Sequence, residues 1–369
     1  MLGSPDGRGF RERVRAAAPA GTLRFGYITD AHCEEGPDPA GYGASSLAQL
    51  AHFSREARAC GAEFLVCGGD LCNGNRPKRQ TVREIRAAGE ALRSGGLPVC
   101  FTIGNHDDNT YFCRDHGGSP EEGLTAREWY RLAEGAVPFP GAHFASATPG
   151  CGYIDLPAYR MRLLLLNTVD LPFVARADGR LRYFTINDHA FSQAQLEFVR
   201  DSALDFTGLP ESESWALAVF SHMRFGYLAN GAAMTGLLTA FRRGGCFETT
   251  GEESYPTPFR FAGSSCFPSP AEPADLAIRI RADFSRQGPR EIIAHFYGHE
   301  HLDEIRRAPG GWPEISFLNA LCYQNAPERP ERTFGSPSEE AWSIVDVDRA
   351  HRSISIFRSG AGNDFSTDF

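Results

Sequence analysis

The sequence predicts an α/β protein in which helices pack against a parallel sheet. Two observations predict this fold class: short apolar segments alternate with segments of helical spacing over the first hundred residues, and the apolar segments have strand length and β-branched or aromatic content. The 369 residues, 42% hydrophobic and 22% charged, have an ordinary soluble composition. A chain of this length buries about 75% of the surface that its unfolded form exposes, so its core needs no disulfides.

The elements follow in chain order. Buried strands are predicted at 23–29, 63–67, 98–103, 160–166, 215–220 and 291–297. Apolar residues at helical spacing predict helices at 45–60, 81–92, 192–200 and 274–284. Three further strands are predicted at 314–321, 341–347 and 353–358, and the alternation in the last of these indicates a sheet with one wetter face.

One domain is expected over 21–360, between a polar lead-in at 1–20 and a C-terminal tail at 361–369. The stretch at 224–273 is rich in Gly, Pro, Ser, Phe and Thr and has weak periodicity, so we expect a long insertion there. Its many aromatic residues make it a candidate for substrate selection, and a purely structural cover is an equally good interpretation.

Charge and cysteine usage narrow the class of protein. The net charge of −9 gives no general attraction to nucleic acid or to anionic membranes, although a local basic cleft is compatible with it. The longest aliphatic run is four leucines, far below the about 20 apolar residues of a membrane span. The ten cysteines form no Cys-x-x-Cys pair and are expected to be buried thiols. These features, with an N-terminus lacking an apolar signal core, predict a cytoplasmic protein.

Five short polar motifs lie at or just beyond the ends of predicted strands. They are Asp30-Ala31-His32, Gly69-Asp70, Gly104-Asn105-His106-Asp107, His222 and Gly298-His299-Glu300-His301. In open α/β sheets that edge of the strands is where ligands bind. The chain's own composition gives about 0.6 Asp-x-His by chance but only about 0.002 Gly-Asn-His-Asp. The joint occurrence of the motifs therefore indicates a functional site.

The residue types in these motifs suit metal binding. Residues i and i+2 of an extended chain point to the same side, so Asp30 is expected to aim with His32, and His299 with His301. Glycines before three of the motifs allow tight turns and close approach of the backbone. Carboxylate and amide oxygens mixed with imidazoles suit a divalent ion such as Mn, Fe or Zn. Seven ligands are too many for one tetrahedral ion, and Asp70 is the natural bridge between two.

The motifs resemble the signature of the calcineurin-like metallophosphoesterases, which runs Asp-x-His, Gly-Asp, Gly-Asn-His-Asp/Glu, His and Gly-His-x-His. The match spans residues 23–301. The resemblance implies a β-sandwich of two mixed sheets flanked by helices, in four layers α/β/β/α, with two divalent ions. It assigns one ion to Asp30, His32, Asp70 and His301. It assigns the other ion to Asp70, Asn105, His222 and His299.

The resemblance also implies two catalytic residues and a branch of the family. His106 matches a histidine beside the scissile phosphate, and Asp107 matches its orienting partner. Leu71-Cys72-Asn73-Gly74 stands where purple acid phosphatases have a ligating tyrosine and where Ser/Thr protein phosphatases have Asp-Arg-Gly. The pattern is therefore most similar to the bacterial, cyclic-nucleotide-phosphodiesterase-like branch.

The function implied is hydrolysis of phosphoric esters by a hydroxide activated between two metal ions, with in-line attack on phosphorus. A phosphodiesterase is the first interpretation. A phosphomonoesterase or a nuclease on the same site is the alternative, and a non-catalytic scaffold is disfavoured because every motif position is intact. The expected partner is a phosphorylated small molecule or a phosphodiester, with nucleic acid less favoured, no membrane partner, and no oligomeric state predicted.

Three nearby residues have plainer interpretations. His295 lies inside a predicted strand and is expected to pack structurally. Ser221 has no Gly-x-Ser-x-Gly elbow, which argues against a serine hydrolase. Arg76 belongs to a basic loop that is either solvated or in contact with a substrate phosphate.

Overall fold

The first of two large sheets contains the N-terminal and C-terminal strands. The structure, a computed structural model, describes residues 9–17, 21–34, 42–135, 139–250, 273–320 and 330–369. The strand order of this sheet is β15-β14-β13-β1-β2-β3. Its strands are β1 (Leu23–Ile28), β2 (Phe64–Cys67), β3 (Val99–Phe101), β13 (Ala341–Asp348), β14 (Ser353–Gly360) and β15 (Phe365–Asp368). Strands β1, β2 and β3 pair in parallel, as predicted, whereas β13 is antiparallel to β1.

The second sheet has the order β11-β12-β10-β7-β6-β5-β4. Its strands are β4 (Ala142–Phe144), β5 (Gly152–Leu156), β6 (Met161–Leu165), β7 (Ala216–Phe220), β10 (Glu291–Tyr297), β11 (Glu304–Arg307) and β12 (Pro313–Ser316). The central strands β6, β7, β10 and β12 run parallel, and β11, β5 and β4 pair antiparallel at the two edges. Strands β8 (Cys246–Thr249) and β9 (Ile280–Asp283) form a separate ribbon.

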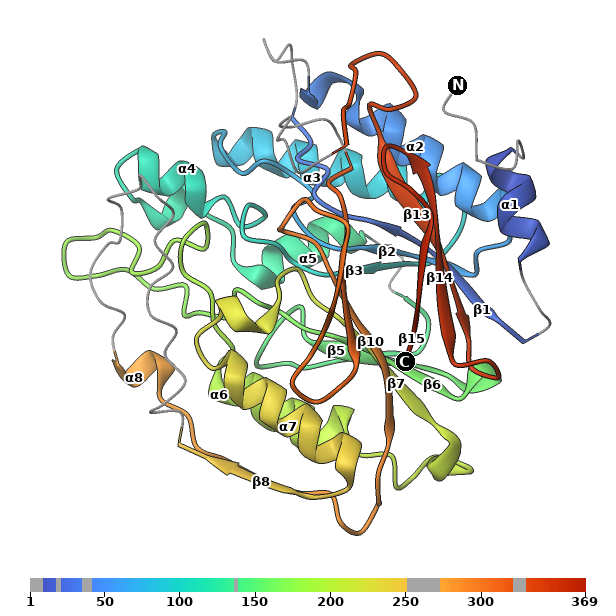
Figure 1. Ribbon diagram of the computed structural model, residues 1–369. Helices are drawn as coiled ribbons and strands as arrows, with labels where there is room; N and C mark the ends of the chain where they lie inside the picture. The colour runs from blue at the N-terminus through green and yellow to red at the C-terminus, as the bar shows by residue number, and fades with distance from the viewer. Residues whose placement is uncertain (1–8, 18–20, 35–41, 136–138, 251–272, 321–329) are drawn as a thin grey trace.

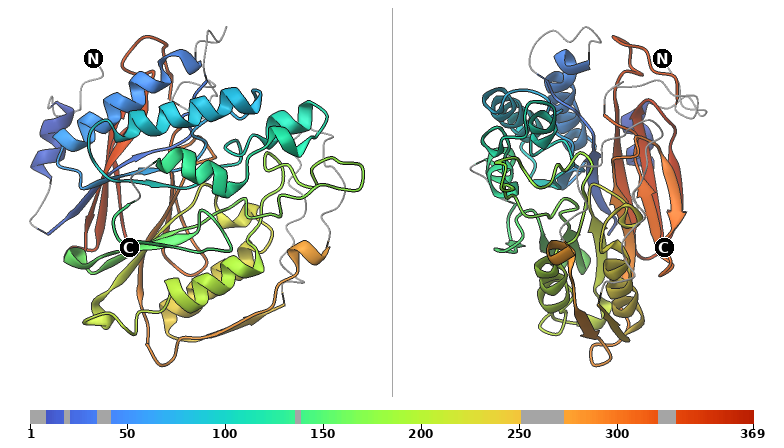
Figure 2. Two further views of the ribbon diagram at one scale, coloured as in Figure 1. Left: turned by 180° about the vertical axis from the view of Figure 1, so that it is seen from behind. Right: turned by 90° about the vertical axis from the view of Figure 1, so that its left-hand side faces the viewer.

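Helices cover the outer faces of both sheets. In Figure 1, α2 and α3 lie above the first sheet and α6 and α7 lie below the second, and Figure 2 shows the same order from behind. The helices are α1 (Phe10–Ala16), α2 (Tyr42–Ala59), α3 (Lys78–Arg93), α4 (Thr110–Asp115), α5 (Ala126–Glu134), α6 (Gln193–Phe198), α7 (Gly231–Arg243) and α8 (Pro273–Leu276). The predicted sandwich of two mixed sheets flanked by helices is thus confirmed. None of the helices in the described ranges is long and apolar enough to cross a membrane.

Successive residues of β1 face opposite sides of the sheet, so this strand packs both against the second sheet and against helix α2. Phe25 points between the sheets, where its ring stacks on Phe64 at 5.3 Å and meets Phe296 edge-on at 5.6 Å. Gly26 faces the other way, and a Cβ there would lie within 3.0 Å of Phe53 on α2. Every residue of β1 is buried, so the strand is covered on both faces. This burial fixes its carboxyl end, where the first motif begins.

Four segments differ from the sequence-based expectation. The helix predicted at 274–284 is wrong: only α8 is helical there, and Ile280–Asp283 is a strand with alternating burial. The apolar spacing of four that suggested a helix also satisfies the period of two of a strand. Within the predicted insertion the sequence analysis missed α7, while residues 251–272 lie outside the described residues. The expected lead-in contains α1, and the expected tail contains β15.

A buried ion pair joins the N-terminal segment to the first sheet. The Arg24 guanidinium donates to both carboxylate oxygens of Asp346 at 2.7 Å, and also to the carbonyls of Cys60 (2.8 Å) and Val14 (2.6 Å). Arg24 and Asp346 are 9% and 4% exposed. The guanidinium therefore connects α1, the end of α2, β1 and β13.

We expect Arg24→Met to lower the free energy of unfolding by about 3–5 kcal/mol, because it leaves the Asp346 carboxylate buried without its counter-charge. The double variant Arg24→Met/Asp346→Leu should recover much of that loss, since it removes the uncompensated charge as well. Urea unfolding of both variants measures the difference. A loss below about 1 kcal/mol in the single variant would contradict the structural role of the pair.

Candidate metal centre

Seven predicted metal-ligating residues converge where the carboxyl ends of five strands meet. Asp30 follows β1, Asp70 follows β2, and Asn105 follows β3 of the first sheet. His222 follows β7, and His299 begins the motif after β10, both in the second sheet. The site therefore lies between the two sheets and takes ligands from each, as expected from the order of the motifs.

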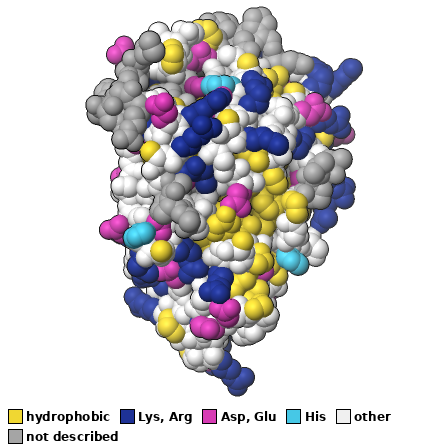
Figure 3. Space-filling view, turned by 90° about the vertical axis from the view of Figure 1, so that its right-hand side faces the viewer, with side chains coloured by type: hydrophobic (Ala, Val, Ile, Leu, Met, Phe, Trp, Pro, Cys, Tyr) yellow, Lys and Arg dark blue, Asp and Glu magenta, His cyan; other side chains and the backbone are white. Residues whose placement is uncertain are grey.

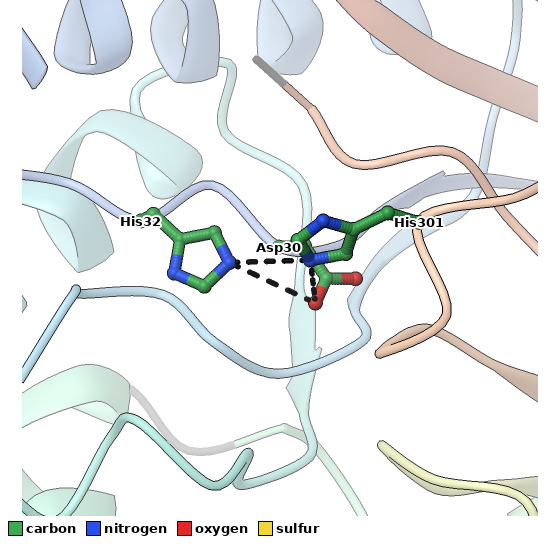
Figure 4. Close-up of side chains that lie close together, drawn as sticks. All are labelled: Asp30, His32 and His301. Atoms are coloured by element: carbon green, nitrogen blue, oxygen red, sulfur yellow. Dashed lines mark hydrogen bonds and ion pairs between the residues drawn. The ribbon is translucent and has the colours of Figure 1, made fainter. Parts of the chain in front are cut away.

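The first ligand group consists of Asp30, His32, Asp70 and His301. His301 Nε2 lies 3.1 Å from Asp30 Oδ1 and 3.3 Å from His32 Nε2. His32 Nε2 lies 3.9 Å from Asp70 Oδ2. Figure 4 shows the facing atoms of Asp30, His32 and His301 directed toward one another.

The second ligand group consists of Asp70, Asn105, His222 and His299. Asn105 Oδ1 lies 3.0 Å from both His222 Nε2 and His299 Nδ1. Asp70 Oδ2 lies 3.2 Å from His222 Nε2. This is the same oxygen that faces His32, so Asp70 belongs to both groups, as the sequence predicted for a bridging residue.

The donor chemistry of the second group fits a cation. His222 Nδ1 lies 2.8 Å from the Gly68 carbonyl oxygen, so that nitrogen carries a hydrogen, and in the neutral ring Nε2 presents its lone pair to the site. The lone pair faces the oxygens of Asn105 and Asp70, which are acceptors as well. Ligands bonded at about 2.0–2.2 Å to one ion lie about 3–3.5 Å apart, which matches these separations.

The pKa values of His222 and His32 also indicate a site for a cation. Burial opposes a charge on His222, but the carboxylates of Asp70 and Asp30 outweigh it and raise its pKa to about 9. Burial, together with the His106 imidazole, lowers the pKa of His32 to about 3. The charged form of His222 is therefore favoured at this point, whereas His32 stays neutral and keeps a lone pair on one ring nitrogen. The carboxylates favour a cation among these ligands, whether a proton or a metal ion.

An unusual backbone conformation orients the ligands. Ten non-glycine residues of the described ranges have positive φ, and five of them are predicted ligands: Asp30 (55°), His32 (43°), Asp70 (51°), His299 (65°) and His301 (53°). The expected convergence is present for Asp30 and His32, whose facing atoms lie 4.0 Å apart, whereas His299 and His301 contact different ligand groups. The expected extended backbone is wrong. Left-handed residues cost about 1–3 kcal/mol each and cluster at functional sites, where the surrounding structure enforces them.

Glycines before the ligands allow the close approach that the sequence analysis expected. A Cβ on Gly104 would overlap Asp70 Oδ1, and a Cβ on Gly69 would come within 2.5 Å of His222 Nδ1. A Cβ on Gly298 would overlap both Thr29 Oγ1 and Asp30 Oδ2. These positions therefore exclude any side chain.

We expect Gly298→Ala to weaken metal binding at the first ligand group by about 10–100-fold, because the new methyl group displaces the Asp30 carboxylate and the hydroxyl that supports it. Calorimetric titration of metal-free protein with Mn²⁺ measures this affinity. Gly245→Ala is the matched control, since nothing lies within 4 Å of its Cβ position. Equal affinities in the two variants would contradict the proposed place of Asp30 in the site.

Hydrogen bonds fix one carboxylate oxygen of Asp70 and one of Asp30, in each case the oxygen that points away from the ligand groups. The His106 backbone N–H donates to Asp70 Oδ1 at 2.9 Å. Asp30 Oδ2 accepts from Thr29 Oγ1 at 2.7 Å and from the His299 backbone N–H at 3.0 Å. Each carboxylate keeps its other oxygen directed into the site, which is how outer contacts orient metal ligands.

His106 lies at the open side of the two ligand groups. Its Nδ1 is 2.8 Å from the Asn73 carbonyl oxygen, and its Nε2 is 4.0 Å from Asp70 Oδ2. The Nδ1 hydrogen is therefore used by the backbone, and Nε2 faces the site. The side chain is 15% exposed, so an incoming molecule can reach it.

Asp107 has different partners from those expected. Its carboxylate accepts from the backbone N–H groups of Asp70 (3.0 Å), Leu71 (2.8 Å), Cys72 (3.3 Å) and Gly104 (2.8 Å). The ring of His106 is oriented by the Asn73 carbonyl instead. The expectation that Asp107 orients His106 directly is therefore wrong, because the carboxylate points inward and joins the turns after β2 and β3.

The structural interpretation of His295 and Ser221 agrees with the structure, whereas Arg76 has a carboxylate partner that the sequence did not predict. His295 is fully buried and its Nε2 lies 2.7 Å from Ser221 Oγ, so both belong to the interior. Arg76 pairs with Glu34 at 3.3 Å. Burial raises the pKa of the Cys33 thiol to about 12, which disfavours the thiolate form that binds metals.

Sequence reasoning missed the segment that contains Thr185 and His189. Thr185 Oγ1 lies 2.9 Å from the Asn105 carbonyl oxygen, and the His189 ring lies 6.0 Å from the ring of His299. Burial and the neighbouring His222 lower the pKa of His189 to about 4. The other site residues were predicted because each of them closely follows a predicted strand. No strand directly precedes this segment, so the same reasoning does not predict Thr185 or His189.

Comparison with known proteins gives the family. A family model described as calcineurin-like phosphoesterase matches residues 23–230, more than half of the chain. A dimetal phosphatase from Danio rerio superposes with a TM-score of 0.58 at 14% identity, over 94% of this chain and 99% of that one. A purple acid phosphatase from seeds of yellow lupin (Lupinus luteus) gives a TM-score of 0.45 at 11% identity, over 94% of this chain and 54% of that one.

No curated protein sequence matches the chain significantly. At 14% identity the likeness to the Danio rerio protein shows the fold, and the family rests on the matching model. The predicted enzyme class, a metal-dependent phosphoesterase, agrees with the matching family model. The chain belongs to the calcineurin-like phosphoesterase family.

Proposed function

We propose that this protein hydrolyses phosphoric esters with two divalent ions, Mn, Fe or Zn, held by the two ligand groups. The observation that carries the proposal is the single Asp70 oxygen that faces His32 at 3.9 Å and His222 at 3.2 Å. Two ions held in this way clamp phosphoryl oxygens and lower the pKa of water, which is the chemistry that a hydrolysis of this kind needs. Asp30, His32 and His301 complete one group, and Asn105, His222 and His299 complete the other.

His106 is the proposed catalytic residue of the chain itself. Since Nδ1–H donates to the Asn73 carbonyl, Nε2 is the ring atom available to a substrate. In its protonated form Nε2 can donate to a phosphoryl oxygen or pass its proton to the leaving alcohol oxygen. Asp107 is a positioning residue, because it orders the turn that carries His106 and Asp70.

We propose a phosphodiester as the substrate on the basis of charge. Arg76 and Arg224, which follow two of the motifs, face Glu34 at 3.3 Å and Glu300 at 3.7 Å. A monoester carries one more negative charge than a diester and would benefit more from a free guanidinium. These paired arginines therefore favour the less charged substrate.

A nuclease is the less favoured alternative. The net charge of −9 gives no general attraction to nucleic acid, and on the one face shown in Figure 3 basic and acidic side chains of the described residues surround an apolar area. A strand of nucleic acid is normally bound by a groove of one sign. The eight described cysteines are free thiols, seven of them buried, which supports the proposed reducing, cytoplasmic location.

The test is the turnover of bis-p-nitrophenyl phosphate against p-nitrophenyl phosphate by metal-stripped protein reloaded with Mn²⁺. We expect faster cleavage of the diester, and a fall of about 100-fold or more in kcat for His106→Ala with its metal content unchanged. His351→Ala is the matched control, because that side chain is 74% exposed. Faster cleavage of the monoester would replace the diesterase by a phosphatase, and no turnover with two ions bound would overturn the hydrolase.

A further inference from the structure

Glu300 lies between two predicted metal ligands that belong to different ligand groups. His299 Nδ1 lies 3.0 Å from Asn105 Oδ1 of the second group, and His301 Nε2 lies 3.1 Å from Asp30 Oδ1 of the first. Glu300 itself belongs to no cluster of potential ligands in the described part of the chain. The contacts that hold Glu300 therefore determine where one ligand of each group lies.

The backbone on both sides of Glu300 has an uncommon conformation. His299 and His301 have φ values of 65° and 53°, and this conformation persists only where the surrounding structure enforces it. Two backbone bonds contribute: the Gly298 N–H donates to the His222 carbonyl at 2.9 Å, and the Glu300 N–H donates to the Gly298 carbonyl at 2.7 Å. Both bonds lie on the N-terminal side of His301, so the position of His301 depends on further contacts.

The Glu300 side chain provides such contacts. Its Oε1 accepts a hydrogen bond from the Tyr227 hydroxyl at 2.8 Å, and the guanidinium Nε of Arg224 lies 3.7 Å from the same oxygen. Arg306 Nη2 lies 3.9 Å from Oε2. The Glu300 side chain is only 10% exposed, so solvent screens these interactions weakly.

These partners connect Glu300 to two other segments of the chain. Arg224 and Tyr227 belong to the segment between β7 and α7, whereas Arg306 lies on β11. The Arg224 guanidinium lies 5.0 Å from the centre of the Tyr227 ring, which is 6.2 Å from the ring of His299. Burial and the bond to Glu300 raise the pKa of Tyr227, so its hydroxyl keeps the hydrogen that it donates.

We propose that Glu300 is a positioning residue that fixes ligands of both ions through its contacts with Tyr227 and the two arginines. The inference rests on the two-ion site of the proposed function, but it concerns the binding of the ions and not turnover. Loss of the carboxylate lets the backbone around His299 and His301 relax from its left-handed conformation, so both ligand groups change together. Outer contacts of this kind change metal affinity about 10–100-fold.

Calorimetric titration of metal-free protein with Mn²⁺ tests this inference. Glu300→Ala should weaken the binding of both ions about 10–100-fold. Glu300→Gln, whose amide oxygen can still accept from Tyr227, should recover most of that loss, and Tyr227→Phe should weaken binding in the same direction. Glu304→Ala is the matched control and should keep the full affinity, because Glu304 pairs with the same Arg306 at 2.5 Å but has 33% of its side chain exposed.

Urea unfolding of the metal-free variants separates positioning from a purely structural role. If Glu300 only stabilised the fold, Glu300→Ala would lower the unfolding midpoint and leave the affinity for Mn²⁺ unchanged, which would overturn the inference. Equal losses in Glu300→Ala and Glu300→Gln would assign the effect to charge and overturn it as well, as would a loss confined to one ion. If Glu300→Ala does not fold, an unchanged affinity in Tyr227→Phe is the overturning result.

These measurements also separate the inference from the proposed function. No substrate is present in the titration, so the role of Glu300 is decided without reference to hydrolysis. Two bound ions without turnover would contradict the hydrolase and leave the role of Glu300 standing. Binding of fewer than two ions by the unmodified protein would overturn both.

Discussion

Asp70→Asn is expected to lower kcat by at least about 1000-fold, because it removes the one charge that both ligand groups share. Several kcal/mol of charge stabilisation at a two-metal site corresponds to a factor of this size. The amide cannot replace the carboxylate in either orientation. If its oxygen faces the ligand groups, its NH₂ meets the His106 N–H that now donates to Asp70 Oδ1 at 2.9 Å. If it is turned over, two hydrogens point at the metal positions.

Metal content and kcat, measured on the same preparation, check this result. We expect fewer than two ions per chain in Asp70→Asn and two in the unmodified protein. Asp201→Asn is the control, since Asp201 has 57% of its side chain exposed and pairs with the neighbouring Arg200. Full turnover with two ions in Asp70→Asn would show that the bridging role belongs to another residue.

Asp107→Ala is expected to lower the free energy of unfolding by about 5 kcal/mol or more. The fully buried carboxylate accepts four backbone N–H groups, and the substitution leaves all four buried without an acceptor. Each lost bond to a charged group is worth about 1.5–3 kcal/mol. Two turns that carry Asp70 and Asn105 would lose their common anchor, so metal binding should weaken as well.

Chemical denaturation measures this loss, with His106→Ala as the neighbouring control. His106 contributes only its ring, which is 15% exposed, so its removal should cost much less stability. The comparison also decides between the two roles considered for Asp107. If Asp107 oriented the His106 ring, Asp107→Ala would lower kcat while stability stayed near that of the unmodified protein.

The order of the motifs allows much of the fold and the ligand set to be predicted. Strands can be identified from short apolar runs, and the polar residue directly after each run falls at the same edge of its sheet. This local rule is enough to predict that Asp30, Asp70 and His222 lie close together. It depends only on which residue follows which strand, and that information is entirely within the sequence.

Other parts of the site depend on contacts that leave no local pattern. Thr185 and Asn105 are 80 positions apart, and nothing around Thr185 marks it as a neighbour of the site. The inward rotation of the Asp107 carboxylate is set by four N–H groups, three of which lie on the turn after β2. The left-handed backbone at Asp30 and His301 is equally hidden, since Asp and His adopt it more often than most residues but still in only a small minority of positions.

The bond between Asp30 and His301 joins residues 271 positions apart, and this separation affects how the protein is made. A chain growing on the ribosome exposes Asp30 and His32 early, yet His301 emerges only after about 270 further residues, which takes on the order of 14–54 s at 5–20 residues per second. During that interval the first ligand group is incomplete. If this group holds an ion, as we propose, the ion can bind only late in biogenesis, after the segments around residues 30 and 301 have come together.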